Sequence, residues 1–352
     1  GFVGLHATSK LFGSHWRTAR SPTWRPFRAS LLSSRHRRDR SRNSLLPSAF
    51  ESTQQCLEIL QSLFHQPATD GAVAEIGSEI VAFMFGQQSL HAADHWLAQY
   101  FPPRVIGIPL HGHAGPNNDS IVPSYRALYG HLADRWTASG FFDHRVDFAA
   151  TDEIQRELWF ELGFGALTKY AGRKTTSIDS NPIHQEITIR QAMLEDHAEV
   201  ERLEKINSRF HHLGPVLWPF LWKDVRESAS GLSKYALSRD RHAIFLATRQ
   251  AETLGMQILF SGMAFGPQIA TREQSVYLFH AIVESNSRGE GVGRALLKHA
   301  LDWAHDSGHS TMTLHYAAMN QVGESFWENH GFETIVYSAG RHIDERLSWA
   351  RP

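Results

Sequence analysis

The chain has 352 residues, of which 42% are hydrophobic and 20% are charged, as in a folded globular protein with room for two domains. No apolar run in the sequence approaches the roughly 18 residues that cross a bilayer, which argues against a membrane protein. The single cysteine, Cys56, excludes an internal disulfide and a cysteine-based zinc site, and it fits a reducing compartment such as the cytoplasm.

The net charge of −1 hides a strong asymmetry. Residues 1–49 contain ten Lys/Arg and only Asp39 as an acid, so they carry about +9 and the remainder about −10. A leader of this kind is typical of a targeting segment or a nucleic-acid-binding arm. Because the chain starts without Met, we interpret residues 1–42 as a disordered extension or as sequence upstream of the true start. The acidic remainder argues against a nucleic-acid partner for the folded part.

The first predicted elements after this leader are a helix at 52–66 and a hairpin through 72–86. A polar stretch with a proline at 174–182 is the predicted linker. Apolar β-branched runs and 3.6-residue periodicity predict further elements in the second half. These are strands at 186–192, 242–250, 254–265, 275–284, 311–317 and 332–338, and helices at 195–210 and 320–332.

The sequence also repeats itself at a distance of 168 residues. Between 126–164 and 294–332, 12 of 39 positions are identical, among them Trp159 and Trp327. Self-similarity of this extent indicates that one structural unit has been duplicated. Each copy is predicted to contain strand, helix, strand, helix and strand in that order.

A run of alternating glycines, residues 288–293, follows the predicted strand at 275–284. The helix predicted after it places Leu297, Ala300, Leu301 and Ala304 on one face. Alternating glycines let the backbone approach a phosphate, which N–H groups and the helix dipole then hold. The run is neither a Walker A loop nor a dinucleotide fingerprint, because Arg294 stands where the latter needs Gly or Ala. By itself the run also fits a tight turn between strand and helix.

With its surroundings, the run resembles a motif of the GNAT superfamily of acyl-CoA-dependent N-acetyltransferases. The pyrophosphate loop of that family reads Arg/Gln-x-x-Gly-x-Gly/Ala after the fourth strand, and Arg288, Gly291 and Gly293 match it. The segment 189–203 looks like the family's first strand and helix. A later family motif, an Asn followed by an aromatic pair and Gly-Phe, is similar to the sequence from 320 to 332.

The resemblance covers 186–352 and, more faintly, 43–172. It implies an α/β (α+β) fold with two GNAT-like domains, each a mixed, mostly antiparallel twisted sheet flanked by helices. We expect a degenerate domain at 43–173, a linker at 174–185 and an acetyl-CoA-binding domain at 186–352. This arrangement is similar to that of tandem acetyltransferases.

The resemblance also implies acetyl-CoA as co-substrate and assigns residues to it. The end of the strand at 282–284 would splay from its neighbour, so that its main chain could pair with the pantetheine arm and polarise the thioester. The loop amides would cradle the pyrophosphate. The expected cofactor-binding residues are Ile282, Val283, Arg288, Gly289, Glu290, Gly291, Val292, Gly293, Arg294, Asn320 and Trp327.

Acetyl transfer to an amine requires a group that accepts a proton from the ammonium. His280 and Glu284 are the candidates, with a packed histidine and a solvated strand end as the respective alternatives. Many family members carry a general-acid Tyr where this chain has Trp327, whose indole N–H is no useful acid. Tyr316 or water would take that role.

We therefore expect an N-acetyltransferase that acts on a primary amine of an unidentified small molecule or peptide. An acetyl-CoA-binding pseudoenzyme or sensor is the alternative. The acceptor groove is expected around 211–224 and the domain junction. The oligomeric state is not predicted.

The first copy lacks the glycine loop. Pro123 aligns with Gly291 and removes an amide donor, while Tyr125 aligns with Gly293 and fills the space that a phosphate needs. We predict that this copy binds no CoA and has a structural or substrate-shaping role.

The 22 histidines raise one more hypothesis, a metal-dependent hydrolase. His91 and His95 are spaced i, i+4, and His111 and His113 follow, which are spacings that zinc sites use. No further ligand pattern completes the set, so we expect packed or surface histidines and no metal.

Overall fold

The structure is a computed structural model that describes residues 24–46, 48–76, 79–93, 95–116, 118, 120–178, 187–219, 232–263, 265–267, 269–270 and 274–350. The chain divides into two compact units, each with its own core. Unit 1 comprises Gly1–His91, Pro102–Leu167 and Ile335–Pro352, and unit 2 comprises Ala92–Phe101 and Thr168–Thr334. Among the described residues, no helix has both the length and the apolarity to cross a bilayer.

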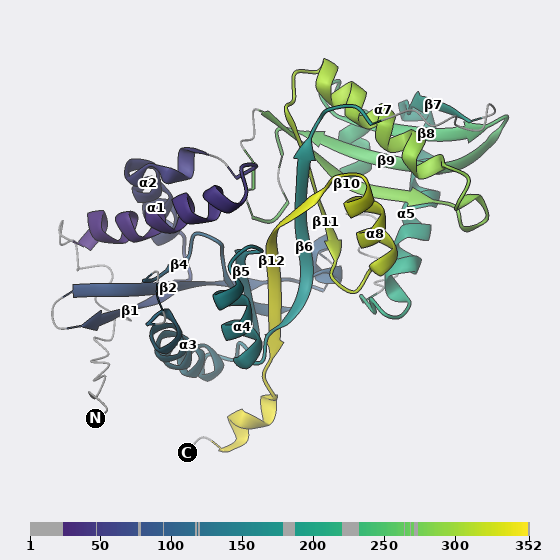
Figure 1. Cartoon of the computed structure of the whole chain (residues 1–352). Helices are drawn as coiled ribbons and strands as arrows, with labels where there is room; N and C mark the ends of the chain where they lie inside the picture. Colours follow the sequence, from purple (N-terminus) through teal and green to yellow (C-terminus); the bar gives the residue numbers. More distant parts are fainter. Residues whose placement is uncertain are drawn as a thin grey trace. The chain divides into compact units, whose positions relative to one another are not determined.

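Unit 1 is a sheet with helices packed against it (Figure 1). Its strands lie in the order β1-β2-β3-β5-β12, with β4 paired to β2. Neighbouring strands are antiparallel except for β3 and β5, which are parallel. The elements are α1 (Trp24–Arg42), α2 (Thr53–His65), β1 (Thr69–Ile76), β2 (Glu79–Leu90), β3 (Arg104–Ile108), β4 (His113–Ala114), α3 (Ile121–Ala138), β5 (Asp143–Ala149), α4 (Glu153–Glu161) and β12 (Glu333–His342).

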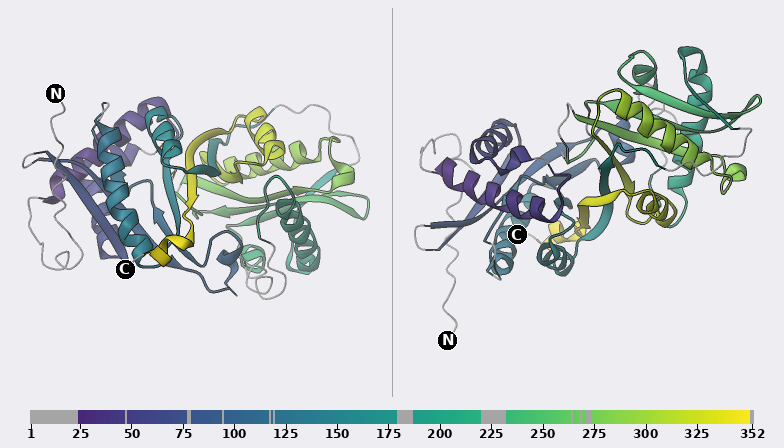
Figure 2. Two further views of the ribbon diagram at one scale, coloured as in Figure 1. Left: turned by 90° about the horizontal axis from the view of Figure 1, so that it is seen from below. Right: turned by 45° about the horizontal axis from the view of Figure 1, so that its top comes forward.

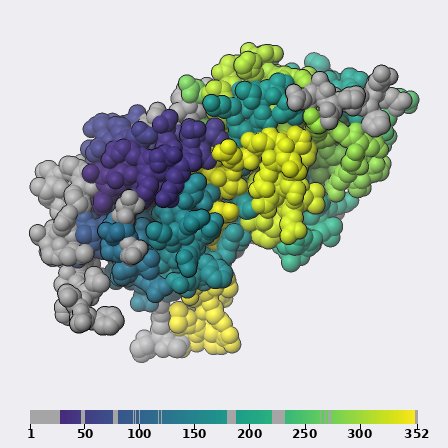
Figure 3. Space-filling view, in the orientation of Figure 1, coloured from purple at the N-terminus to yellow at the C-terminus, as the bar shows by residue number. Residues whose placement is uncertain are grey.

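The prediction of a disordered leader is wrong for residues 24–42, and residues 1–23 lie outside the described residues. Ala29 and Leu32 are fully buried in a core shared with α2 and β2. Arg35 is only 1% exposed, and its Nη1 donates a hydrogen bond to the carbonyl of His113 at 2.5 Å. A narrow apolar face at helical spacing is thus enough to fold this basic segment. In Figure 3 the purple atoms of α1 and α2 form a continuous patch.

Unit 2 is a sheet with the strand order β7-β8-β9-β10-β11-β6. The helix α7 covers one face and α5 the other, as the left view of Figure 2 shows. The elements are β6 (Gly165–Lys174), β7 (Thr188–Gln191), α5 (His197–His212), β8 (Ala243–Arg249), β9 (Glu252–Ser261), β10 (Ser275–Val283), α7 (Val292–Asp306), β11 (Thr311–Ala317) and α8 (Gln321–Asn329). The predicted strands and helices of the second half correspond to these elements, except that the strand predicted at 332–338 is β12 of unit 1. Most of the predicted linker lies outside the described residues.

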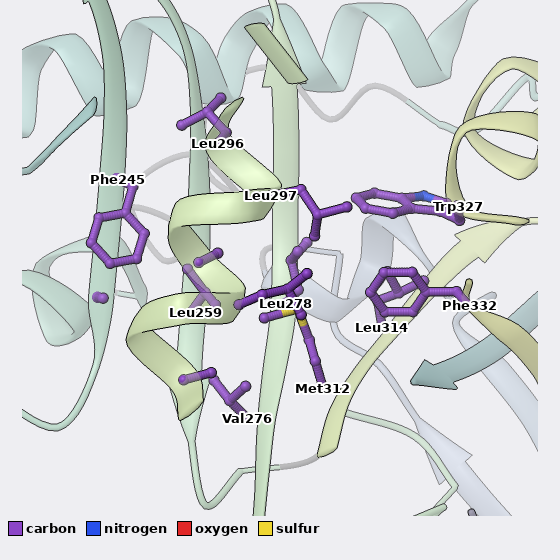
Figure 4. Close-up of a cluster of buried hydrophobic side chains, with 14 of the residues drawn as sticks. Phe245, Leu259, Val276, Leu278, Leu296, Leu297, Met312, Leu314, Trp327 and Phe332 are labelled. Atoms are coloured by element: carbon purple, nitrogen blue, oxygen red, sulfur yellow. The ribbon is translucent and has the colours of Figure 1, made fainter. Parts of the chain in front are cut away.

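The core on the α7 face is built from the periodic residues that the sequence indicates. Leu297, Ala300, Leu301 and Ala304 are all fully buried. They pack on the strand residues Leu278 and Leu314, among others. Figure 4 shows Leu297 pointing toward the ring of Trp327, with Phe332 beside Leu314. The α5 face has a separate core around Val200 and Leu203.

The duplication is visible in the elements themselves. A shift of 168 residues superposes β5 on β11, α4 on α8 and β6 on β12 without any change in length. The last strands, however, are exchanged: β12 pairs with β5 in unit 1, and β6 pairs with β11 in unit 2. The registers are equivalent, since Ala149 lies opposite Val336 and Ala317 opposite Thr168. The predicted domains, each one continuous stretch of chain, are therefore wrong for these two strands.

Candidate functional site

The site begins where two parallel strands of unit 2 separate. β10 and β11 pair only from Ser275–Leu278 to Thr311–Leu314. Beyond that point β11 stays with β6, while β10 has a bulge between Leu278 and His280 and continues beside β9 alone. One edge of the remaining β10 backbone therefore has no strand partner among the described residues. The predicted splaying of this strand is present and begins four residues before Ile282.

A cavity of about 500 Å³ lies at this separation, entirely within unit 2. Its walls come from β10, β11, α5, the glycine loop, the start of α7 and α8. It brings together twelve residues that the sequence predicts for the site. These are Ile282, Val283, Arg288, Gly289, Gly291, Val292, Gly293, Arg294, Asn320, Trp327, His280 and Tyr316.

The glycine loop has the shape of an anion cradle. Gly289 and Gly291 have φ of +83° and +87°, a region that side chains disfavour. An added Cβ at either position would meet nothing within 4 Å, so the space before α7 is open. Gly291 is the N-cap of α7 and has no side chain that could cap this end. The first-turn amides and the helix dipole therefore suit a phosphate.

Two residues beside the cradle are held by hydrogen bonds. The Nε of Arg288 donates to the carbonyl of Val283 at 3.2 Å, and its guanidinium lies 5.2 Å from the ring centre of Phe210. Asn320 caps α8, because its Oδ1 accepts a hydrogen bond from the Gly323 amide at 3.0 Å. Both side chains are thus fixed at the cavity wall.

Two predicted residues do not line the cavity. Glu284 forms an ion pair with Arg202 of α5, and Glu290 forms one with Arg249 of β8. These arginines lie far away in the sequence, so the sequence pattern gave no sign of the pairing. The geometry leaves Glu284 badly placed to accept a proton inside the cavity.

Tyr316 and Trp327 are packed side chains at the cavity wall. The hydroxyl of Tyr316 lies 3.2 Å from Oγ1 of Thr334, and burial raises the pKa of this phenol. Trp327 packs edge-on against Phe326 and Phe332, with ring centres 4.9 and 5.4 Å apart. A phenol with a raised pKa keeps its proton but releases it less readily.

His280 lies on the α5 side of the cavity. Its ring stacks on Phe279 with 4.2 Å between centres. Its Nδ1 is 3.4 Å from Oε1 of Glu204 but makes no well-aligned hydrogen bond within the described part of the chain. Glu204 does not line the cavity; it lies behind His280 and accepts a hydrogen bond from the Ser233 hydroxyl at 2.7 Å. The pair offers an imidazole to the cavity with a carboxylate behind it.

The other residues on the α5 side of the cavity were only partly predicted. Asn207, Ser208 and His211 line it from one face of α5, and Trp218 and Pro219 follow in the segment expected for the acceptor groove. Tyr100 comes from Ala92–Phe101, which the sequence did not connect with this site. The spacing of the three α5 residues was the available signal, because it places them on one helix face. The position of Tyr100 follows from tertiary structure alone.

A sequence model described as the acetyltransferase (GNAT) family matches residues 201–332, which contain the glycine loop, both separating strands and α8. The chain carries a GNAT acetyltransferase domain. Residues 201–332 lie within unit 2, so the family match and the cavity coincide.

Curated relatives agree with this GNAT assignment. The human proteins N-acetyltransferase 8 and 8B are each 26% identical over 129 and 128 residues. The matched region is 34% of this chain and 55% and 54% of those proteins. The chain thus spans about half the length of the curated relatives that it matches.

A solved structure extends the likeness in fold beyond the GNAT domain. The GCN5-related N-acetyltransferase from Sphaerobacter thermophilus aligns with a TM-score of 0.54 and 13% sequence identity. The alignment covers 92% of this chain and 94% of that one. At this identity the comparison establishes the mixed α/β fold of both units and nothing about substrates.

The position in unit 1 that corresponds to the GNAT cavity is filled. Tyr125, which aligns with Gly293, is fully buried, and its hydroxyl lies 3.0 Å from Nδ1 of His113. The ring of Trp159 lies 6.1 Å from that of Tyr125. From α1, Arg35 bonds to the His113 carbonyl. His113 aligns with Ala281 of β10. In unit 1 the Arg35 side chain therefore contacts the backbone at the position where the GNAT domain leaves it open.

The histidines proposed as metal ligands have other contacts. The Nδ1 of His95 accepts a hydrogen bond from the Leu97 amide at 3.2 Å, and Nδ1 of His111 lies 3.0 Å from Nε2 of His36. Within the part of the chain that the structure describes, no three His, Cys, Asp or Glu side chains form a group that could hold a metal ion.

Proposed function

We propose that the chain is an acetyl-CoA-dependent N-acetyltransferase that acts on a primary amine. The observation that carries the proposal is the union, in one cavity, of an open glycine cradle, an unpaired strand edge and a histidine. The GNAT domain supports the acetyltransferase class, while the donor and the acceptor belong to the proposal.

Each part of the cavity has a role in holding the donor. The amides at Gly291–Gly293 would bind the pyrophosphate, and Arg294 would add positive charge at the same end. The β10 backbone near Val283 would pair with the pantetheine arm through groups that no strand of the described chain engages. Acetyl-CoA, when bound, supplies an activated acetyl thioester.

His280 is the proton acceptor in this proposal. It lines the cavity, and the Glu204 carboxylate 3.4 Å from its Nδ1 would stabilise the imidazolium formed when the amine loses a proton. Glu284 is the weaker candidate, because its carboxylate pairs with Arg202 outside the cavity wall.

An acetyl-CoA-binding pseudoenzyme is the second candidate function. Two observations favour it: Trp327 has the position of the family's usual acid, and the Tyr316 hydroxyl is engaged by Thr334. Neither of these two side chains is then poised to protonate the departing thiolate. A CoA thiolate leaves readily enough that water suffices in the enzyme hypothesis.

The experiment is to measure release of free CoA from acetyl-CoA by the full chain with a panel of primary amines. We expect turnover with at least one amine and none with the Gly291→Trp variant, whose indole would occupy the cradle. Binding of acetyl-CoA without turnover by any amine supports the pseudoenzyme instead.

Gly308 provides a matched control at the other end of α7. It has φ of +83°, and nothing lies within 4 Å of an added Cβ, as for Gly291. Gly308→Trp therefore introduces the same backbone strain without entering the cavity. Equal loss of activity in both variants would contradict the assignment of the cradle.

A further inference from the structure

The acceptor end of the cavity has an aromatic wall. The ring of His211 stacks on that of Trp218, with centres 5.1 Å apart and planes inclined by 17°. Tyr100 meets the same indole edge-on at 5.5 Å. All three line the cavity. They form a mainly apolar, aromatic part of the cavity wall.

The wall is held in place by the backbone. After α5 ends, the chain turns back, and the Trp218 amide donates a hydrogen bond to the His211 carbonyl at 2.9 Å. The Trp218 carbonyl accepts one from Nδ1 of His212 at 3.0 Å. Bonds on both sides of its Cα fix the backbone at Trp218, and the rings of His211 and Tyr100 pack against its indole.

The charge at this end is also distinctive. Among the described lining residues, the only arginines are Arg288 and Arg294, which belong to the glycine loop and the first turn of α7. Burial lowers the pKa of His211, and it lowers that of His315 to about 3, so both rings are neutral at physiological pH. The Glu204 carboxylate lies 3.4 Å from Nδ1 of His280, which lines this end. The described residues that form the aromatic wall carry no positive charge, so this end favours a cation over an anion.

Resting on the proposed function, we propose that the acceptor is a primary amine on an aromatic or similarly flat apolar body, with no carboxylate or phosphate beside the amine. The body would stack on Trp218, and the ammonium would approach His280 under the field of Glu204. A carboxylate on the same carbon as the amine would be brought near Glu204, and none of the described residues of the aromatic wall carries a positive charge to pair with it, which is costly.

The test compares 2-phenylethylamine with phenylalanine and with ethylamine, using free CoA release by the full chain. Phenylalanine adds only a carboxylate to the first compound, and ethylamine removes only its ring. We expect kcat/KM for 2-phenylethylamine to exceed that for phenylalanine by at least about 100-fold, as an unpaired buried charge demands. Comparable values for these two would overturn the inference while leaving the acetyltransferase proposal intact.

A variant links the preference to the wall. Trp218→Ala is expected to lower kcat/KM for 2-phenylethylamine by about 10-fold or more, but that for ethylamine by less than about 2-fold. Trp349→Ala is the matched control, because Trp349 is 79% exposed in unit 1. The affinity for acetyl-CoA should stay unchanged in both variants, which reports on folding.

Two further outcomes are decisive. An equal loss for both amines in Trp218→Ala would place the indole outside the acceptor site and overturn the inference. Absence of turnover with every amine, with acetyl-CoA still bound, would overturn the proposed function and this inference with it.

Discussion

At the scale of single residues, the pair formed by His280 and Glu204 governs the proposed chemistry. The two side chains come from β10 and α5, and each is 15% exposed. The carboxylate is anchored by Ser233, so it has a defined position behind the imidazole. Glu204 does not itself line the cavity and acts through His280, which makes it a positioning residue.

The first residue-scale prediction concerns this pair. His280→Gln should lower kcat by roughly 100-fold or more, the usual contribution of a general base, with little change in acetyl-CoA affinity. Glu204→Gln should lower kcat by about 10-fold and leave KM for the donor unchanged, and Glu204→Asp should recover part of the loss. Steady-state kinetics with the best amine measure both effects.

Glu201→Gln is a suitable control, because Glu201 lies one turn earlier on α5 and its partner is His197 at 3.8 Å. The assignment is wrong if His280→Gln retains wild-type kcat. A structural role alone would lower donor affinity and protein yield in Glu204→Gln and would not be relieved by Glu204→Asp.

The residues of the site were predictable to different degrees. Gly289, Gly291 and Gly293 carry a local pattern, and the structure places all three at the cavity. Glu284 carried an equally plausible local signal, but its partner Arg202 is 82 positions away. A contact between residues so far apart in the sequence depends on how α5 packs on the sheet. No local spacing in a single sequence predicts it.

At the scale of elements, α1 shows how a basic segment becomes part of a core. Ala29 and Leu32 of this helix are buried, and so are Arg35 and His36. The composition of this basic segment predicted disorder, because the segment is rich in arginine. The three-residue spacing of small and apolar side chains was the overlooked signal.

The stability of the fold should depend on pH through a histidine of α1. His36 is 3% exposed, its Nε2 lies 3.0 Å from Nδ1 of His111, and burial lowers its pKa well below 6.5. In the unfolded chain the same ring binds a proton near pH 6.5. The unfolded state therefore gains the proton first as the pH falls, and the folded state loses stability through His36 below that value.

The measurement is urea unfolding of the wild type and of His36→Gln at several pH values. The free energy advantage of the wild type should shrink as the pH falls from about 7.5 to about 5.5, by up to ~1.4 kcal/mol per pH unit. The carboxylates of unit 1 titrate equally in both proteins, so their contribution cancels when the two free energies of unfolding are compared. An advantage that grows on acidification would contradict a neutral buried His36.

The exchange of β6 and β12 is the element-scale feature that the sequence could not predict. The two strands are equivalent in the repeat, and both pair in the same register with their partners. Either assignment satisfies the same local pattern of side chains. Only the tertiary structure decides which unit each strand joins. The strand itself is therefore predicted correctly, but the strand with which it pairs is not.

At the scale of the whole molecule, the two units are copies of one duplicated structural unit that differ at the cavity. Unit 2 keeps the open cradle, with Gly291 at the N-cap of α7. In unit 1 the corresponding space holds Tyr125, while Arg35 of α1 bonds to the backbone at His113. The central claim is that one copy binds acetyl-CoA and the other has replaced that ligand with its own side chains.

The most direct measurement is an isothermal titration of the full chain with acetyl-CoA. The account predicts one molecule bound per chain, and no binding by Gly291→Trp, while Tyr125→Phe binds as the wild type does. Two molecules bound per chain, or unchanged affinity in Gly291→Trp, would contradict it.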